Sequence, residues 1–228
     1  TRQVIQIHSV QGVRHKSDGS WDFLIDPDHR IAYVRITNFM ENTPADLDKA
    51  LLPLLEPAPG QRILLVGQSY GAAIATLMAA QRPDQTAGLV LLSGYFGKSG
   101  PTARFLIDIG QRVLGVIPRD LKHAVLEAAG QPRQLNPVFR LLNSFPFLVT
   151  IIHGDKDDFA PIEVARAIAD TTLAPARFIE IKGGDHFLND EPPEQLLACL
   201  ESAIDPRGGL RQVLTLSPDE RQAMSLAS

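Results

Sequence analysis

The chain has 228 residues, which suits one domain of ordinary size. Hydrophobic residues make up 44% of it and charged residues 21%, so it can build a substantial core, and disorder over the whole length is excluded. The net charge of −4 argues against a nucleic-acid partner, which would need clustered Lys and Arg. The longest apolar runs, such as residues 63–66 and 147–152, are too short to span a bilayer.

The single cysteine, Cys199, excludes an internal disulfide and a cysteine-rich metal site. It lies at an apolar position of a helical pattern, so we expect a buried, inert thiol. The first residues show no signal-peptide pattern, and the expected location is the cytoplasm. No H-E-x-x-H spacing occurs, so the sequence gives no support for a metal-assisted mechanism. No organic cofactor is predicted.

In chain order, segments with the two-residue period of strands alternate with segments of helical period. We predict strands at residues 3–10, 30–37, 62–66, 88–92, 147–152 and 177–181. We predict helices from Thr43, as N-cap with Pro44 first in the helix, and over residues 72–81, 102–142 (broken by prolines) and 193–204. This alternation predicts an α/β fold, with a mostly parallel central sheet flanked by helices. A single domain is expected over residues 1–205, followed by a polar tail at 206–228.

The sharpest signal is the sequence Gly67-Gln68-Ser69-Tyr70-Gly71, between a predicted strand and a predicted helix. A serine on so tight a turn needs small neighbours, which the two glycines supply, and the turn exposes its hydroxyl at the carboxyl edge of the sheet. The amide of Tyr70 is then well placed to stabilise an oxyanion. The alternative is a glycine-rich turn whose serine only caps the helix.

Two later loops carry the acid and the base that a nucleophilic serine needs. The sequence HGDKDDFAP (153–161) follows one predicted strand, and GGDHF (183–187) follows the next. Open parallel sheets bind their ligands at these carboxyl ends of the strands. For Asp155, Asp158 and Asp185 we expect loop solvation or helix capping, and His153 is interpreted as a packed or backbone-bonded histidine.

Residues 51–205 resemble the α/β-hydrolase superfamily through three motifs in the family's order: G-x-S-x-G, G-x-x-D-x-x-x-P (Gly154, Asp157 and Pro161) and GGDHF. The resemblance implies that Ser69 is the nucleophile, Asp157 the acid and His186 the general base. It also implies a second oxyanion donor from a loop after an early strand, which often starts His-Gly. The comparable position here is His8-Ser9-Val10, so the amide of Val10 is the candidate donor.

Residues 1–50 resemble a segment of the carboxy-terminal-processing serine peptidases, mainly through the string IAYVRITNF–ENT–DL–AL. That family's nucleophile and lysine have no equivalent in this chain, so the segment does not bring peptidase activity. We therefore consider a fusion or recombined chain with a junction near residues 50–59.

The predicted function is hydrolysis of an ester-like bond in a small, partly apolar substrate through a Ser-His-Asp triad and an acyl-enzyme, as in a carboxylesterase. Residues 96–145 resemble a small helical cap, whose apolar side chains either line a substrate pocket or are ordinary buried stripes. One alternative is a hydrolase-like binding or scaffold domain with an incomplete oxyanion hole. Another keeps the triad but cleaves a thioester, amide or carbon–carbon bond, and the oligomeric state is left open.

Overall fold

The computed structural model describes residues 9–37, 42–56, 59–97, 137–188 and 193–204. Within it the chain forms two compact units, Thr1–Gln61 and Arg62–Ser228. Three predictions lie largely or wholly outside the described residues: the strand at 3–10, the middle of the helical cap and the tail at 206–228. The single domain over residues 1–205 stays a prediction.

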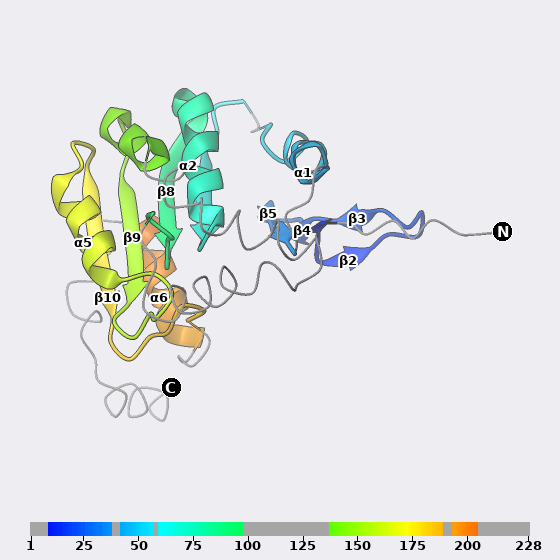
Figure 1. The fold of residues 1–228 in the computed structure, drawn as a ribbon. Helices are drawn as coiled ribbons and strands as arrows, with labels where there is room; N and C mark the ends of the chain where they lie inside the picture. Colours follow the sequence, from blue (N-terminus) through cyan, green and yellow to red (C-terminus); the bar gives the residue numbers. More distant parts are fainter. Residues whose placement is uncertain (1–8, 38–41, 57–58, 98–136, 189–192, 205–228) are drawn as a thin grey trace, which may run out of the picture. The chain divides into compact units, whose positions relative to one another are not determined.

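The second unit is built on a parallel sheet of four strands (Figure 1). The strands lie in the order β10 (Ala176–Ile181), β9 (Val149–Gly154), β8 (Thr86–Leu92) and β7 (Ile63–Gln68). Helices α2 (Gly71–Gln81), α5 (Ile162–Thr171) and α6 (Pro193–Ile204) follow β7, β9 and β10. The sheet with its flanking helices confirms the predicted α/β class.

The alternating side chains of β8 show why residues 89–92 of this strand are all apolar. Leu89 and Leu91 are buried in a cluster that includes residues of α2 and α5. Val90 and Leu92 are buried in a second cluster with Cys199 of α6. Both faces of this part of the strand are therefore covered, as is usual in parallel sheets, and none of these four positions faces water.

Two parts of the second unit differ from the expected pattern. Strands of parallel sheets are usually buried on both faces, but Val66 of β7 is 48% exposed, because β7 is the edge strand of the described sheet. At the ends of the predicted cap, Phe96, Leu142 and Phe145 are buried in the cluster with α2. These residues belong to the core, whereas residues 98–136 of the cap lie outside the described part of the chain.

The first unit contains three antiparallel two-stranded pairs and helix α1 (Thr43–Leu51). The pairs are β1 (Val10–Gln11) with β6 (Arg35–Ile36), β2 (Arg14–His15) with β3 (Trp21–Asp22), and β4 (Leu24–Asp26) with β5 (Ile31–Ala32). The single strand predicted at 30–37 is wrong, since it divides into β5 and β6, which pair with different partners. Its apolar alternation does not mark a core face, because Ile31 and Tyr33 are 52% and 48% exposed.

Helix α1 begins one residue earlier than predicted. Asn42, not Thr43, is the N-cap residue, so Pro44 occupies the second helical position. The shift is permitted because the first turn of a helix has no internal partners for its N–H groups, and Pro lacks that group. The side chain of Asn42 donates to Asp46 Oδ2 at 2.8 Å instead of capping the backbone.

Across the described ranges, we find no helix long and apolar enough to cross a membrane. The same residues contain no group of three or more His, Cys, Asp or Glu side chains able to hold a metal ion.

Cys199 supplies a simple test of the packing of α6. The thiol is buried, as predicted, and burial raises its pKa to about 11, so the reactive thiolate is scarce at neutral pH. We expect no reaction with Ellman's reagent in the native protein and one thiol per chain after denaturation in urea. Rapid reaction of the native protein would contradict the packing of α6 against β8.

Candidate active site

Ser69 lies on the turn between β7 and α2 and has a left-handed backbone with φ of +53°. This conformation is costly for a residue with a side chain and is typical of a nucleophile presented on a strained turn. Two backbone hydrogen bonds hold the turn: the Ser69 amide donates to the Leu92 carbonyl, and the Tyr95 amide donates to the Ser69 carbonyl. The end of β8 therefore fixes the position of the serine.

The two glycines of the G-x-S-x-G sequence have different structural roles. A Cβ atom at Gly67 would lie closer than 3.0 Å to backbone atoms of Gly71 and Ala72, so only glycine is accommodated there. A Cβ atom at Gly71 would have no neighbour within 4 Å among the described residues. The prediction that both glycines make room for the turn is therefore correct for Gly67 and wrong for Gly71.

The structure brings Ser69, His186 and Asp157 into one hydrogen-bonded chain. Ser69 Oγ lies 2.8 Å from His186 Nε2, and His186 Nδ1 lies 2.8 Å from Asp157 Oδ2. Asp157 comes from the loop after β9, and His186 from the loop after β10. The His186 ring and the Asp157 carboxylate are both buried, whereas Ser69 is only half-buried. The serine hydroxyl is thus the accessible end of the chain.

A close backbone contact between Gly154 and Gly184 holds the two loops together. A Cβ atom on Gly154 would lie closer than 3.0 Å to the Gly184 carbonyl group. The Lys156 amide donates to the same Gly184 carbonyl at 3.0 Å, and the Asp155 carboxylate accepts from the Gly183 amide at 2.5 Å. Asp155 thus has a structural role that joins the two loops, rather than the loop solvation or helix capping expected from the sequence.

Asp157 accepts hydrogen bonds at both carboxylate oxygens. Oδ1 accepts from the amides of Phe159 (2.9 Å) and Ala160 (2.8 Å), whereas Oδ2 contacts His186 and His153. Burial opposes ionisation of this group, but the hydrogen bonds from His153, His186 and Ala160 outweigh it and lower the pKa of Asp157 well below its usual value. The carboxylate therefore stays ionised at neutral pH and accepts a hydrogen bond from His186 Nδ1–H.

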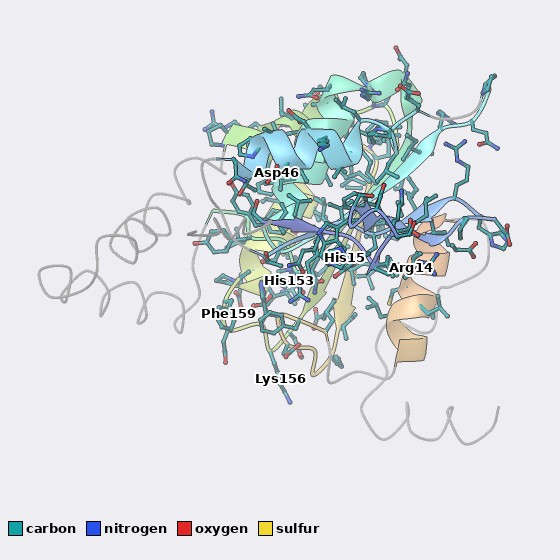
Figure 2. The ribbon with its side chains drawn as sticks, turned by 90° about the vertical axis from the view of Figure 1, so that its right-hand side faces the viewer. Arg14, His15, Asp46, His153, Lys156 and Phe159 are labelled. Carbon is teal, nitrogen blue, oxygen red and sulfur yellow. The ribbon has the colours of Figure 1, made fainter. Side chains whose placement is uncertain are left out.

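His153, at the carboxyl end of β9, is fully buried, and its Nε2 lies 2.8 Å from the Ala160 carbonyl, as the sequence interpretation expected (labelled in Figure 2). The same Nε2 also lies 3.2 Å from Asp157 Oδ2. Both partners are acceptors, so Nε2 carries the proton. The sequence analysis did not predict the contact with Asp157. The spacing of four residues between His153 and Asp157 is the one sequence feature that could have indicated it.

The two remaining carboxylates of these loops, Asp185 and Asp158, do not contact His186 through an observed hydrogen bond. Asp185 Oδ1 accepts from the Phe187 and Leu188 amides at 2.9 and 2.6 Å. Asp158 is exposed, and α5 begins after the N-cap residue Pro161 without a side-chain cap, so the predicted capping by Asp158 is not observed.

The candidate oxyanion donors lie in different units of the structure. Tyr70 is the N-cap residue of α2, directly after Ser69, where a helix N-terminus favours negative charge. Val10 is buried in the first unit and pairs with Ile36. The contribution of both amides to an oxyanion hole stays a prediction.

Comparisons with known proteins agree with this fold. Residues 34–140 match the family model described as serine aminopeptidase, S33. The chain is 41% identical over 59 residues to lipase LipV of Mycobacterium tuberculosis, and 28% identical over 151 residues to human monoglyceride lipase. These alignments cover 26% and 64% of this chain, but only 23% and 48% of the two lipases. The chain thus spans about a quarter and about half of the curated relatives it matches.

Among solved structures, the Paleococcus ferrophilus monoacylglycerol lipase superposes with a TM-score of 0.51 and 18% identity, covering 75% of this chain and 76% of the other. The fold is therefore that of the α/β-hydrolase superfamily. The family match begins at residue 34, ahead of the junction considered near residues 50–59, and the fusion stays a prediction.

The unequal surroundings of the two elbow glycines predict unequal effects of adding a methyl group. Gly67→Ala must displace the backbone at Gly71, and we expect it to lower the free energy of unfolding by about 2–3 kcal/mol. Gly71→Ala, at the first helical residue, should change it by less than about 1 kcal/mol. Urea denaturation followed by circular dichroism measures both, and equal losses would contradict the described turn.

The lowered pKa of Asp157 predicts a pH dependence of stability. An unfolded aspartate takes up a proton near pH 4, whereas the native carboxylate does so only at lower pH. Asp157 therefore contributes stability at neutral pH that is lost as the pH falls below about 4. The free-energy difference between the parent and Asp157→Asn should shrink from about pH 6 to about pH 3. Asp158→Asn, at an exposed neighbour, is the control and should follow the parent.

Proposed function

We propose that this protein is a serine hydrolase that cleaves ester bonds through an acyl-enzyme. The observation that carries the proposal is the hydrogen-bonded chain from Ser69 Oγ through His186 to Asp157 Oδ2, with the serine on a left-handed turn. A nucleophile, a base in contact with it and a third group that orients the base are the parts this chemistry requires.

The first step is acylation of Ser69. The ionised Asp157 accepts the Nδ1–H of His186, which leaves Nε2 unprotonated and able to take the Ser69 Oγ proton. As the proton moves, Oγ forms a bond to the ester carbonyl carbon, and negative charge develops on the carbonyl oxygen. Asp157 holds the ring orientation and stabilises the imidazolium.

Collapse of this intermediate breaks the bond to the alcohol oxygen, which takes the proton from His186 Nε2 and leaves. Water then gives a proton to Nε2 and attacks the acyl carbon, and the carboxylic acid is released as Ser69 recovers its proton. The amide of Tyr70, with that of Val10 as second donor, is our proposed oxyanion hole. Each such donor is worth about 3–4 kcal/mol to the transition state.

The substrate we propose is a small, partly apolar carboxylic ester, as for a carboxylesterase. The names of the relatives, lipase LipV and monoglyceride lipase, support an ester substrate. A small molecule rather than a nucleic acid agrees with the net charge of −4. We place the protein in the cytoplasm, where a free thiol such as that of Cys199 stays reduced.

The second candidate is a binding or scaffold domain with an impaired oxyanion hole. The observation behind it is the sequence His8-Ser9 in front of Val10, where many members of the superfamily have His-Gly. Cleavage of thioester, amide or carbon–carbon bonds by the same triad is a further alternative, because the triad does not set the substrate.

Labelling with a fluorophosphonate probe separates these proposals. We expect the parent to be labelled and Ser69→Ala and His186→Ala not to be, with ester hydrolysis falling at least about a thousandfold in both. Ser144→Ala, which changes an exposed hydroxyl elsewhere in the second unit, is the control and should label like the parent. A folded parent that fails to label would favour the scaffold, and esters of increasing chain length would then not be hydrolysed.

A further inference from the structure

The loops that carry Asp157 and His186 share one local structure. Asp157-Asp158-Phe159-Ala160 and Asp185-His186-Phe187-Leu188 both read Asp-x-Phe followed by a small or aliphatic residue. In each, Oδ1 of the first Asp accepts from the amides two and three residues later, at 2.9 and 2.8 Å in one loop and 2.9 and 2.6 Å in the other. Such turns fix the backbone of the residues they enclose, and here each fixes a phenylalanine.

The two phenylalanines meet around the base. The ring centroids of Phe159 and Phe187 each lie 5.3 Å from that of His186, and they lie 6.1 Å from one another. Phe159 projects from the loop after β9, together with Lys156 (Figure 2). The backbone carbonyl of Phe187 also accepts from Gln68 Nε2 at 3.1 Å, so the residue preceding Ser69 helps to hold the backbone of Phe187 in place.

Phe187 keeps 53% of its surface exposed although its backbone is held by hydrogen bonds. Leaving a phenyl ring in water is unfavourable in proportion to its exposed apolar area. The next residue, Leu188, is 4% exposed, so the same turn buries one apolar side chain and presents another beside the histidine. An exposed ring beside His186 is suited to contact a substrate group that binds next to this histidine.

The chemistry identifies which half of an ester would lie there. During acylation, His186 Nε2–H gives its proton to the oxygen of the leaving alcohol, so this oxygen must be within hydrogen-bond reach of Nε2. The group attached to that oxygen then extends next to the rings that contact His186. The acyl group, by contrast, stays bonded to Ser69.

We propose that Phe159 and Phe187 form a binding subsite for an apolar, preferably aromatic, alcohol group of the ester substrate. This inference rests on the proposed serine-hydrolase function and deepens it by naming the selected half of the substrate. Rings of this kind bind aromatic groups in stacked or edge-to-face contact. No bond changes in the subsite itself: the C–O bond breaks between the acyl carbon and the alcohol oxygen, and the alcohol leaves with the proton of His186.

The test compares esters that share one acyl group, methyl butyrate and benzyl butyrate, whose alcohols have similar acidity. In Phe187→Ala and Phe159→Ala, the ratio of kcat/KM for the benzyl ester to that for the methyl ester should fall about tenfold. Phe187→Leu keeps an apolar side chain and should lie between Phe187→Ala and the parent. Leu173→Ala removes another exposed apolar side chain, in the loop that leads into the amino end of β10. It should leave the ratio as in the parent, because His186 follows the carboxyl end of that strand.

A second readout uses the reverse of the same step. Added benzyl alcohol should compete with water for the acyl-enzyme and form benzyl butyrate from methyl butyrate in the parent. The yield of this transfer relative to hydrolysis should fall in both alanine variants, because the acceptor alcohol enters where the leaving alcohol departs.

The outcomes separate the two proposals. If the variants label with the fluorophosphonate and the benzyl-to-methyl ratio is unchanged, the subsite is wrong and the hydrolase function stands. If instead the variants change the preference among methyl esters with different acyl groups, the rings contact the acyl side and the inference is overturned. If the folded parent neither labels nor hydrolyses any ester, the proposed function itself has failed.

Discussion

The buried carboxylate of Asp157 is the interaction on which the rest of the site depends. It joins the end of β9 through His153, its own loop through Phe159 and Ala160, and the loop after β10 through His186. A charge removed from water is tolerated only when hydrogen bonds replace its hydration, and loss of one partner of a buried pair typically costs about 3–5 kcal/mol. The same contacts that satisfy the carboxylate therefore fix the imidazole that faces Ser69.

Close backbone contacts make this arrangement possible. Gly67 allows the elbow to fold back onto Gly71, and Gly154 allows the loop after β9 to touch the loop after β10 at Gly184. Because the strands are parallel, their carboxyl ends meet at one edge, and loops that follow different strands become neighbours there. The sheet brings the three side chains to the same edge, and the glycines remove the steric obstacles to contact between their loops.

Most strands and helices of the second unit, and the three residues of the site, can be predicted from the sequence, because the patterns that indicate them are local. Runs of apolar residues predict buried strands, and apolar residues at helical spacing predict helices. The three motifs predict the order of nucleophile, acid and base along the chain. What the sequence could not supply depends on distant partners. Residues 30–37 alternate like a strand, but their two halves pair with β4 and β1. Likewise, the contact between His153 and Asp157 depends on the path of the loop after β9, which the sequence does not show. The open space beside Gly71 depends on which residues pack nearby, and the sequence does not show this either.

The strand order has a consequence for how the protein acquires its site. In the described sheet each strand pairs with its neighbour in the sequence, so β7, β8, β9 and β10 can be added one after another. The contact between Ser69 and His186 spans 117 residues and joins the two outermost strands of this series. A folding intermediate that lacks β10 would have the serine on its elbow but not the histidine that contacts it. The hydrogen-bonded chain from Ser69 to Asp157 is thus a property of the completed sheet, because it can form only after the last strand has docked.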